Sequence, residues 1–124
     1  MKKLMIILFL AILAGCYYDN EEELYPYEPE CDTTNVTYSG TIYPIISDNC
    51  FGCHNSSTPQ GNVLLKDYAT ISAAAAIPAG QYGSLYGAVS HASGNSPMPK
   101  NGTKLSDCKI LQIKKWIDDG VPDN

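Results

Sequence analysis

The chain has 124 residues and a formal net charge of −5 at pH 7, and all eight of its basic residues are lysines. This length allows one small domain with a tail, and the acidic balance excludes nucleic-acid binding, which requires a basic face. An acidic surface suits a protein partner with a complementary basic patch, and it equally suits a protein that uses its charge only for solubility.

The first fifteen residues form a basic and then apolar leader. Lys2 and Lys3 precede an unbroken apolar run over residues 4–14, and Leu13-Ala14-Gly15-Cys16 resembles the lipobox of bacterial lipoproteins. Eleven apolar residues are too few to span a bilayer but suit a signal-peptide core. The resemblance implies that residues 1–15 are removed and that acylated Cys16 anchors an exported chain to a bacterial membrane, on its periplasmic or cell-surface side. An ordinary secretory signal with an incidental cysteine is the alternative.

The composition changes abruptly over residues 16–30. This stretch carries six acidic residues and two prolines, a composition typical of a disordered or extended segment. We expect it to be an acidic tether to a folded domain over residues 31–124. Without residues 1–15, six lysines remain against 13 acidic residues, so the mature chain carries a charge of −7.

A first amphipathic helix is expected at the start of the folded part. Its buried face consists of isoleucines at helical spacing, Ile42, Ile45 and Ile46. Pro44 fits only the first turn of a helix, so the helix begins after a cap at Ser39 or Thr41 and its last turn reaches Cys50. Residues 36–38 before it form a short extended segment.

Three further helices follow along the chain. Each begins after a residue whose side chain can cap its first turn, namely Asp67, Ser84 and Ser106. The first two are short, over residues 68–76 and 85–89. The last runs from Asp107 to Asp119, with Gly120 after its end. Its apolar stripe and the side chains that flank it are Ile110, Ile113 and Ile117 with Leu111 and Trp116.

The stretch Cys50-Phe51-Gly52-Cys53-His54 carries the clearest chemistry. Two thiols three positions apart, with an imidazole beside the second, have the spacing that attaches a c-type haem. The two sulfurs add across the porphyrin vinyl groups, and His54 supplies the proximal nitrogen to the iron. A redox disulfide of thioredoxin type is the first alternative, but that motif opens a helix near a βαβ pattern. A structural zinc site usually needs four Cys or His ligands, and the chain has only two histidines.

A single methionine is the candidate for the distal side of such a haem. Pro97-Met98-Pro99 lies in a loop over residues 93–103, and the prolines stiffen the chain on both sides of the thioether. Met98 is the only methionine left without the leader, so we expect it to be the distal iron ligand. His91 competes with it, but two imidazoles would give a lower reduction potential than Met/His ligation. We expect His91 to be a surface or haem-edge residue.

The five cysteines are accounted for by these assignments. Cys16 takes lipid, and Cys50 and Cys53 take haem, which leaves Cys31 and Cys108. Because an exported chain meets oxidising conditions in which disulfides persist, we expect these two to form a disulfide across 77 positions. Two free thiols are the alternative.

These segments together resemble the small mono-haem cytochrome c domains of class I type. The resemblance rests on Ile42 to Ile45, Cys50 to His54, Met98-Pro99 and Trp116 to Gly120. It implies an all-α fold of three to five helices around one haem c, with short strands or none. It also implies a membrane-anchored carrier of single electrons between redox proteins. Such a chain is not an enzyme in its own right, although a place as the electron-transfer subunit of a larger oxidoreductase is left open.

Two other functions are compatible with the same residues. In a haem-based sensor or small-ligand-binding lipoprotein, Met98 is displaced or never bound, and a gas or peroxide reaches the iron. In a non-haem surface lipoprotein, the cysteines form two disulfides. The Pro-Met-Pro loop separates the first alternative from the electron carrier, and covalently bound pigment separates the second.

Overall fold

Residues 31–124, apart from residues 56 and 101, are described by a computed structural model of the chain. This part of the chain forms four α-helices and no strand, which confirms the prediction of a small all-α domain. The predicted leader, the tether and the lipid site at Cys16 lie outside the described residues. None of the described helices has the length and apolar character needed to cross a bilayer.

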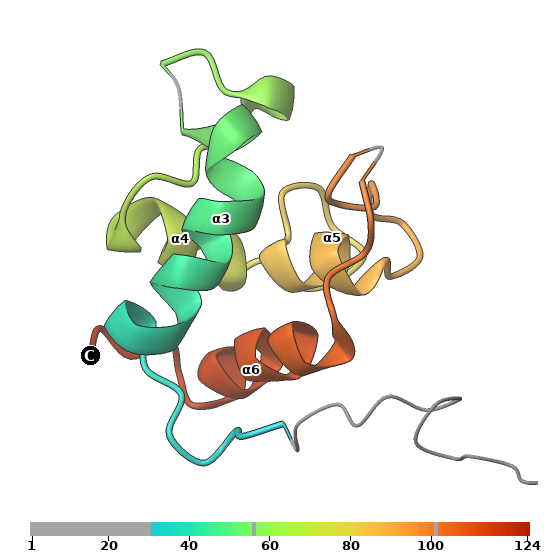
Figure 1. Cartoon of the computed structure of the whole chain (residues 1–124). Coiled ribbons are helices and arrows are strands. Elements are labelled where there is room, and N and C mark those ends of the chain that lie inside the picture. Colours follow the sequence, from blue (N-terminus) through green and yellow to red (C-terminus); the bar gives the residue numbers. More distant parts are fainter. Residues whose placement is uncertain (1–30, 56, 101) are drawn as a thin grey trace, which may run out of the picture. The chain divides into compact units, whose positions relative to one another are not determined.

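The elements follow one another in a simple order (Figure 1): η1 (Tyr38–Ile42), α3 (Tyr43–His54), η2 (Gln60–Asn62), α4 (Tyr68–Ala75), α5 (Leu85–Ser90) and α6 (Asp107–Asp118). η1 is a π-helical turn that leads directly into α3, and η2 is a single 3-10 turn. α6 contacts both η1 and α5, and α4 packs against α5. The domain is therefore held together by α6 at one end of α3 and by the short helices beside it.

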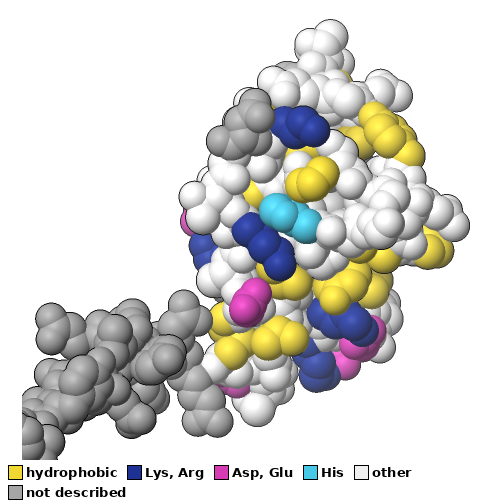
Figure 2. All heavy atoms as spheres, turned by 90° about the vertical axis from the view of Figure 1, so that its right-hand side faces the viewer, with side chains coloured by type: hydrophobic (Ala, Val, Ile, Leu, Met, Phe, Trp, Pro, Cys, Tyr) yellow, Lys and Arg dark blue, Asp and Glu magenta, His cyan; other side chains and the backbone are white. Residues whose placement is uncertain are grey.

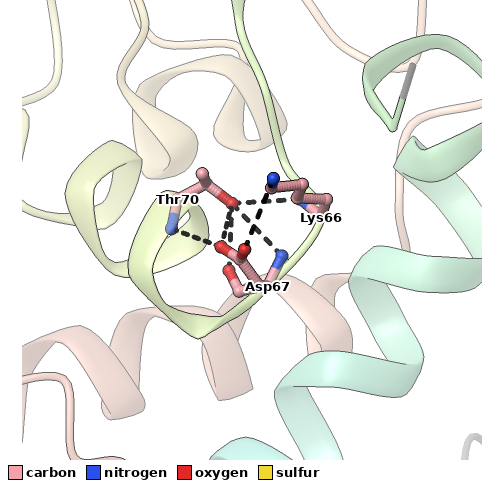
Figure 3. A network of polar contacts seen from close by, with 3 residues as sticks. All are labelled: Lys66, Asp67 and Thr70. Atoms are coloured by element: carbon pink, nitrogen blue, oxygen red, sulfur yellow. Dashed lines mark hydrogen bonds and ion pairs between the residues drawn. The ribbon is translucent and has the colours of Figure 1, made fainter. Parts of the chain in front are cut away.

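The caps of α4, α5 and α6 are the predicted ones. The side chains of Asp67, Ser84 and Ser106 each accept a hydrogen bond from a backbone N–H in the following first turn. Asp67 and Thr70 form a full capping box, in which each side chain accepts from the backbone N–H of the other (Figure 3). The Thr70 backbone N–H and the Thr70 hydroxyl both donate to the Asp67 carboxylate and lower its pKa, and Lys66 adds an ion pair at 3.9 Å. A short helix such as α4 depends on these local bonds.

The predicted start of the first helix is wrong by two to four residues. The cap is Thr37, not Ser39 or Thr41, and its hydroxyl accepts from the backbone N–H three residues later at 3.1 Å. Tyr38 is consequently helical rather than extended. Its side chain is only 8% exposed, so tertiary burial, which the local sequence does not reveal, decides where the helix begins. Pro44 lies in the first turn of α3, as predicted.

The core is a single cluster of apolar side chains that joins the helices. Its fully buried apolar members are Ile42, Ile46, Ile71, Ile113 and Trp116. Tyr38, Tyr68 and Trp116 form what we call the aromatic cluster, with the Tyr38 ring 5.8 Å from Trp116 and 5.1 Å from Tyr68. The Tyr68 hydroxyl donates to the Val121 carbonyl at 2.7 Å, and the indole N–H donates to the Pro122 carbonyl at 2.9 Å. The polar groups of Tyr68 and Trp116 are thus satisfied by backbone carbonyls after the end of α6.

Cys31 and Cys108 form the predicted disulfide, with their Cα atoms 5.2 Å apart. The bond attaches the first described residue to the first turn of α6. A second contact reinforces this attachment, because the Gln112 side chain donates to the Asp32 carbonyl at 3.1 Å. The segment before η1 is therefore fixed to α6 rather than to α3.

Candidate functional site

The Cys50–His54 stretch forms the last part of α3. The sequence predicts that the helix ends at Cys50. In the structure it continues to His54, because no residue in the motif breaks it. Spacings of three and four residues place side chains on the same side of a helix. Cys50, Cys53 and His54 accordingly line one cavity. A Cβ at Gly52, between the two cysteines, would meet nothing within 4 Å.

This cavity has a volume of about 360 Å³, within the range of about 300–1,000 Å³ typical of small-molecule pockets. Its walls come from α3, the 60–65 segment, α4, α5 and the loop that precedes α6. The aliphatic part of the lining includes Val63, Leu65, Leu85, Ala88, Val89 and Leu105. The described lining contains no carboxylate. The cavity therefore suits a ligand with a large apolar body.

His54 is held in an orientation that suits metal binding. The ring is 8% exposed, and its Nδ1 lies 2.8 Å from the Val63 carbonyl oxygen. Because a carbonyl only accepts, Nδ1 carries the proton and Nε2 keeps a free lone pair. The His54 carbonyl also accepts from Leu65 N–H at 2.8 Å, so two bonds fix this helix end to the 63–65 segment. An imidazole oriented by a backbone carbonyl in this way is the usual form of a histidine ligand.

Both cysteines of the motif are free thiols in the structure, with Cys50 half-buried and Cys53 exposed. Burial raises the pKa of the Cys50 thiol to about 11, and the nearby Cys53 charge contributes less. A thioredoxin-type cysteine has the opposite property, a pKa lowered at the start of a helix. Here the thiols lie at the end of α3, where the helix dipole disfavours a thiolate. The site therefore lacks the electrostatics of a redox dithiol.

The described part of the chain offers no set of ligands for a structural zinc ion. Among residues 31–124 without 56 and 101, no group of three or more His, Cys, Asp or Glu side chains is arranged to hold a metal ion. Structural zinc usually requires four protein ligands. A metal ion bound by His54 would therefore need most of its ligands from a prosthetic group such as a porphyrin.

Met98 lines the same cavity as His54 and is half-buried. Its backbone N–H donates to the Ala88 carbonyl at 3.0 Å, and its own carbonyl lies 3.1 Å from Nε2 of His91. The loop is thus attached to α5 on both sides of the methionine. His91 is exposed at the C-cap of α5 and is not part of the cavity lining. The structure brings Met98 and His54 to one cavity and leaves His91 at the surface, where the sequence predicts it.

Sequence reasoning missed Asn95, which joins two loops of the site. Its Oδ1 accepts from Gly80 N–H at 2.6 Å, and its Nδ2 donates to the Gln81 carbonyl at 2.7 Å. It lies against Gly87 of α5, where an added Cβ would be 2.1 Å from the Asn95 Oδ1. Asn95 therefore fixes the loop that carries Met98 to the loop that precedes α5.

Sequence reasoning also missed Tyr82. This side chain is 73% exposed, yet it lines the cavity, and its hydroxyl donates to the Gly61 carbonyl. It links the loop before α5 to η2 across the cavity rim. A tyrosine in a glycine-rich loop carries no local signal for such a contact.

The described residues fit a covalently attached haem in their chemistry. Two thiols lie one helical turn apart, an imidazole nitrogen without a described hydrogen bond lies beside them, and a methionine lines the same largely apolar cavity. These are the groups that hold and ligate haem c. Comparisons of the chain with models of protein families, with curated proteins and with solved structures found no match.

Proposed function

We propose that this chain is a membrane-anchored c-type cytochrome that carries single electrons between redox proteins in the bacterial cell envelope. The observation that supports this most strongly is that Cys50, Cys53, His54 and Met98 line one largely apolar cavity. Haem c bound there supplies reversible one-electron transfer between its ferric and ferrous states. A small cytochrome c-like arrangement of the helices around one haem belongs to the same proposal.

The residues of the site have distinct proposed roles. Cys50 and Cys53 hold the haem through thioether bonds to its vinyl groups, and His54 is the proximal iron ligand. The Val63 carbonyl, 2.8 Å from Nδ1, orients the imidazole and increases its basicity. Met98 is the distal ligand, and its sulfur favours a higher potential than a second imidazole would. Two protein ligands leave the iron no position for a substrate, which is why we propose a carrier and not an enzyme.

The rest of the chain supports a location outside the cytoplasm. The disulfide between Cys31 and Cys108 is of the kind that persists in oxidising compartments. The lipobox-like sequence before Cys16 and the acidic stretch over residues 16–30 suit a lipid anchor and a tether. We therefore propose a domain held near the membrane surface, on the periplasmic or cell-surface side.

The decisive experiment is haem content after export. The full chain is produced in a bacterium that assembles another c-type cytochrome, and its haem is measured by the pyridine haemochrome method. We expect one haem per chain that resists extraction with acidic acetone. We expect a chain with Cys50→Ser and Cys53→Ser to be colourless, with an unchanged helical circular dichroism spectrum. A folded wild-type chain without pigment, in a host that loads the control cytochrome, would contradict the proposal.

A second variant separates the carrier from a haem-based sensor. Met98→Leu conserves volume but removes the thioether, so we expect a lower reduction potential and loss of the sulfur-to-iron absorption band at unchanged haem content. His91→Gln is the matched control in the same loop contact, and we expect it to retain that band. An unchanged spectrum and potential in Met98→Leu would show that the sulfur does not ligate iron and would favour the sensor.

A further inference from the structure

Gly87 lies inside α5 although its backbone does not require a glycine. It is not among the residues with a positive φ, and glycine in the interior of a helix is less favourable than alanine. α5 has only six residues, so this cost falls on a helix that is already too short to be stable alone. A contact outside the helix must therefore explain the glycine.

That contact is with the side chain of Asn95. A Cβ added at Gly87 would lie 2.6 Å from the Asn95 Cγ and 3.0 Å from its Nδ2, which is closer than side chains pack. Gly87 is buried and Asn95 is half-buried. The space beside Gly87 is thus occupied by the Asn95 amide, and α5 gives up helix propensity to admit it.

Both polar atoms of this amide are bonded to the loop before α5. Oδ1 accepts from Gly80 N–H at 2.6 Å, and Nδ2 donates to the Gln81 carbonyl at 2.7 Å. The two loops also approach closely here, because a Cβ at Gly94 would lie 3.0 Å from the Gly80 carbonyl oxygen. We call these two bonds, together with the contact at Gly87, the Asn95 clamp. The clamp joins α5 to the loops on both sides of it.

The clamp lies next to the attachment point of Met98. The Met98 N–H donates to the Ala88 carbonyl at 3.0 Å, and Ala88 directly follows Gly87. Asn95, Ala88 and Met98 all line the cavity. His91 also reaches the Met98 carbonyl, at 3.1 Å, but its ring is exposed, so water competes for that bond. The position of Met98 therefore depends more on the clamp than on His91.

Burial contributes little to the position of this loop. None of residues 93–100 is buried. Figure 2 shows the side of the domain that carries α5, where backbone and uncharged polar atoms make up most of the surface in view. Segments with few buried apolar contacts open locally at a low free energy. Hydrogen bonds and close backbone contacts must therefore keep the loop closed.

We propose that Asn95 is the positioning residue for the distal iron ligand. This inference rests on the proposed function, because it takes Met98 as that ligand. Packed against Gly87, Asn95 holds Met98 at the cavity before haem is bound, and afterwards it controls how often the sulfur leaves the iron. The clamp thereby determines how readily a small external ligand reaches the metal, which is the property that distinguishes an electron carrier from a haem-based sensor.

Displacement of Met98 by imidazole tests this role in the haem-loaded ferric full chain in neutral detergent. At saturating imidazole the rate is limited by departure of the sulfur. We expect Asn95→Ala to raise this limiting rate by about 5- to 30-fold, the factor that corresponds to the loss of two hydrogen bonds. An unchanged rate would show that Asn95 only stabilises the fold, and would overturn the proposal.

Ile42→Val is the control for stability alone. Ile42 is fully buried in η1 and does not line the cavity, and this substitution lowers the stability of a core by an amount comparable with the loss of the two bonds. We expect it to leave the rate of imidazole displacement unchanged. An increase equal to that in Asn95→Ala would mean that any destabilised variant releases Met98, which would also overturn the proposal.

Gly87→Ala separates the clamp from helix propensity. Alanine favours the helix and by itself should stabilise α5, whereas the added Cβ must expel the Asn95 side chain. We therefore expect faster imidazole displacement, as in Asn95→Ala. In the double variant, the shorter side chain at position 95 leaves room for the Cβ at position 87, so the two effects should not add. Slower displacement in Gly87→Ala, or additive effects, would contradict the clamp.

Hydrogen exchange at the Met98 amide provides a readout that does not depend on haem. In the haem-free full chain, we expect exchange about 5- to 30-fold faster in Asn95→Ala and unchanged in Ile42→Val, because the loop opens locally and not with the whole domain. Equal exchange in Asn95→Ala and the wild-type chain would overturn the clamp. A colourless wild-type chain would contradict the proposed function, while this measurement would still test the clamp.

Discussion

The two ends of α3 are stabilised in different ways. At its beginning, η1 and α6 meet through the aromatic cluster, in which Tyr38 and Trp116 are buried and the Tyr68 hydroxyl and the Trp116 indole donate to backbone carbonyls. At its other end, Cys50 and Cys53 are only partly covered, and loops held by side-chain bonds from Asn95 and Tyr82 surround a cavity. Close packing thus stabilises the first end of α3. The other end borders an open apolar cavity that a bound group can fill.

The helices of the cavity end reflect the same difference. α4 has eight residues and α5 has six, and isolated helices shorter than about 12–15 residues are marginal in water. Both helices therefore depend on their caps at Asp67 and Ser84 together with the burial of Ile71, Leu85 and Val89. The comparison predicts large effects of substitutions at the α6 end and smaller, local effects at the cavity end.

Trp116→Ala should show the largest effect, because it removes a fully buried ring of the aromatic cluster and its bond to the Pro122 carbonyl. We expect the free energy of unfolding to fall by about 3–5 kcal/mol, measured by urea denaturation. Leu111→Ala on the same helix is the control, since this side chain is 53% exposed and should change stability by about 0.5 kcal/mol or less. Similar losses for both variants would contradict the concentration of stability at this end.

Loss of the disulfide is expected to come next. Cys31→Ser with Cys108→Ser opens a crosslink across 77 positions, which in the chain-entropy model lowers stability by about 4 kcal/mol. Because neither cysteine lines the cavity, we expect haem content to be unchanged wherever the variant is folded. A variant that stays stable but loses haem would show that the two ends are coupled.

Local signals in the sequence predict much of this fold. Asp67, Ser84 and Ser106 cap the expected helices because capping depends on residues within one turn. The motif and the single remaining methionine predict four of the residues that line the cavity, Cys50, Cys53, His54 and Met98, and counting cysteines pairs Cys31 with Cys108. All of these predictions depend on residue spacing or residue identity, which can be read directly from the sequence.

The remainder depends on contacts between distant segments. Asn95 bonds residues 14 and 15 positions away, and Tyr82 bonds Gly61 at a separation of 21. Neither contact has a local pattern. The predicted start of the first helix is wrong for the same reason, because Tyr38 is placed by packing against rings from α4 and α6. Long-range packing overrides local propensity at these positions.

The Cys50 thiol provides a third prediction, at the cavity end. Burial and the nearby Cys53 charge raise its pKa from 9.0 to about 11, so at pH 8 its thiolate fraction is roughly 100-fold lower than that of an unshifted thiol. In the haem-free chain with Cys53→Ser, which removes the smaller contribution and leaves burial, we expect slow alkylation by iodoacetamide that continues to accelerate well above pH 9. The urea-unfolded chain is the control. A plateau near pH 9 in the folded chain would mean that the cavity wall is open to water at Cys50.

Asn95→Ala should have the smallest effect on stability. It removes two hydrogen bonds in an exposed loop region, which we expect to lower the free energy of unfolding by about 1–2 kcal/mol. Faster hydrogen exchange at the Gly80 amide should accompany this loss. Ser93→Ala in the same loop is the control and should alter neither quantity. A loss as large as that of Trp116→Ala would contradict the contrast between the two ends.

The buried indole of Trp116 also gives the protein an internal optical reporter. It is the only tryptophan of the chain and is fully buried, so its fluorescence comes from one defined environment. A domain of about 94 residues has a radius of gyration of about 12 Å, which places any porphyrin in the cavity within the range of energy transfer from this indole. Its emission would therefore be strong in the pigment-free folded chain and quenched in the loaded one, and a single spectrum would distinguish the two forms during purification.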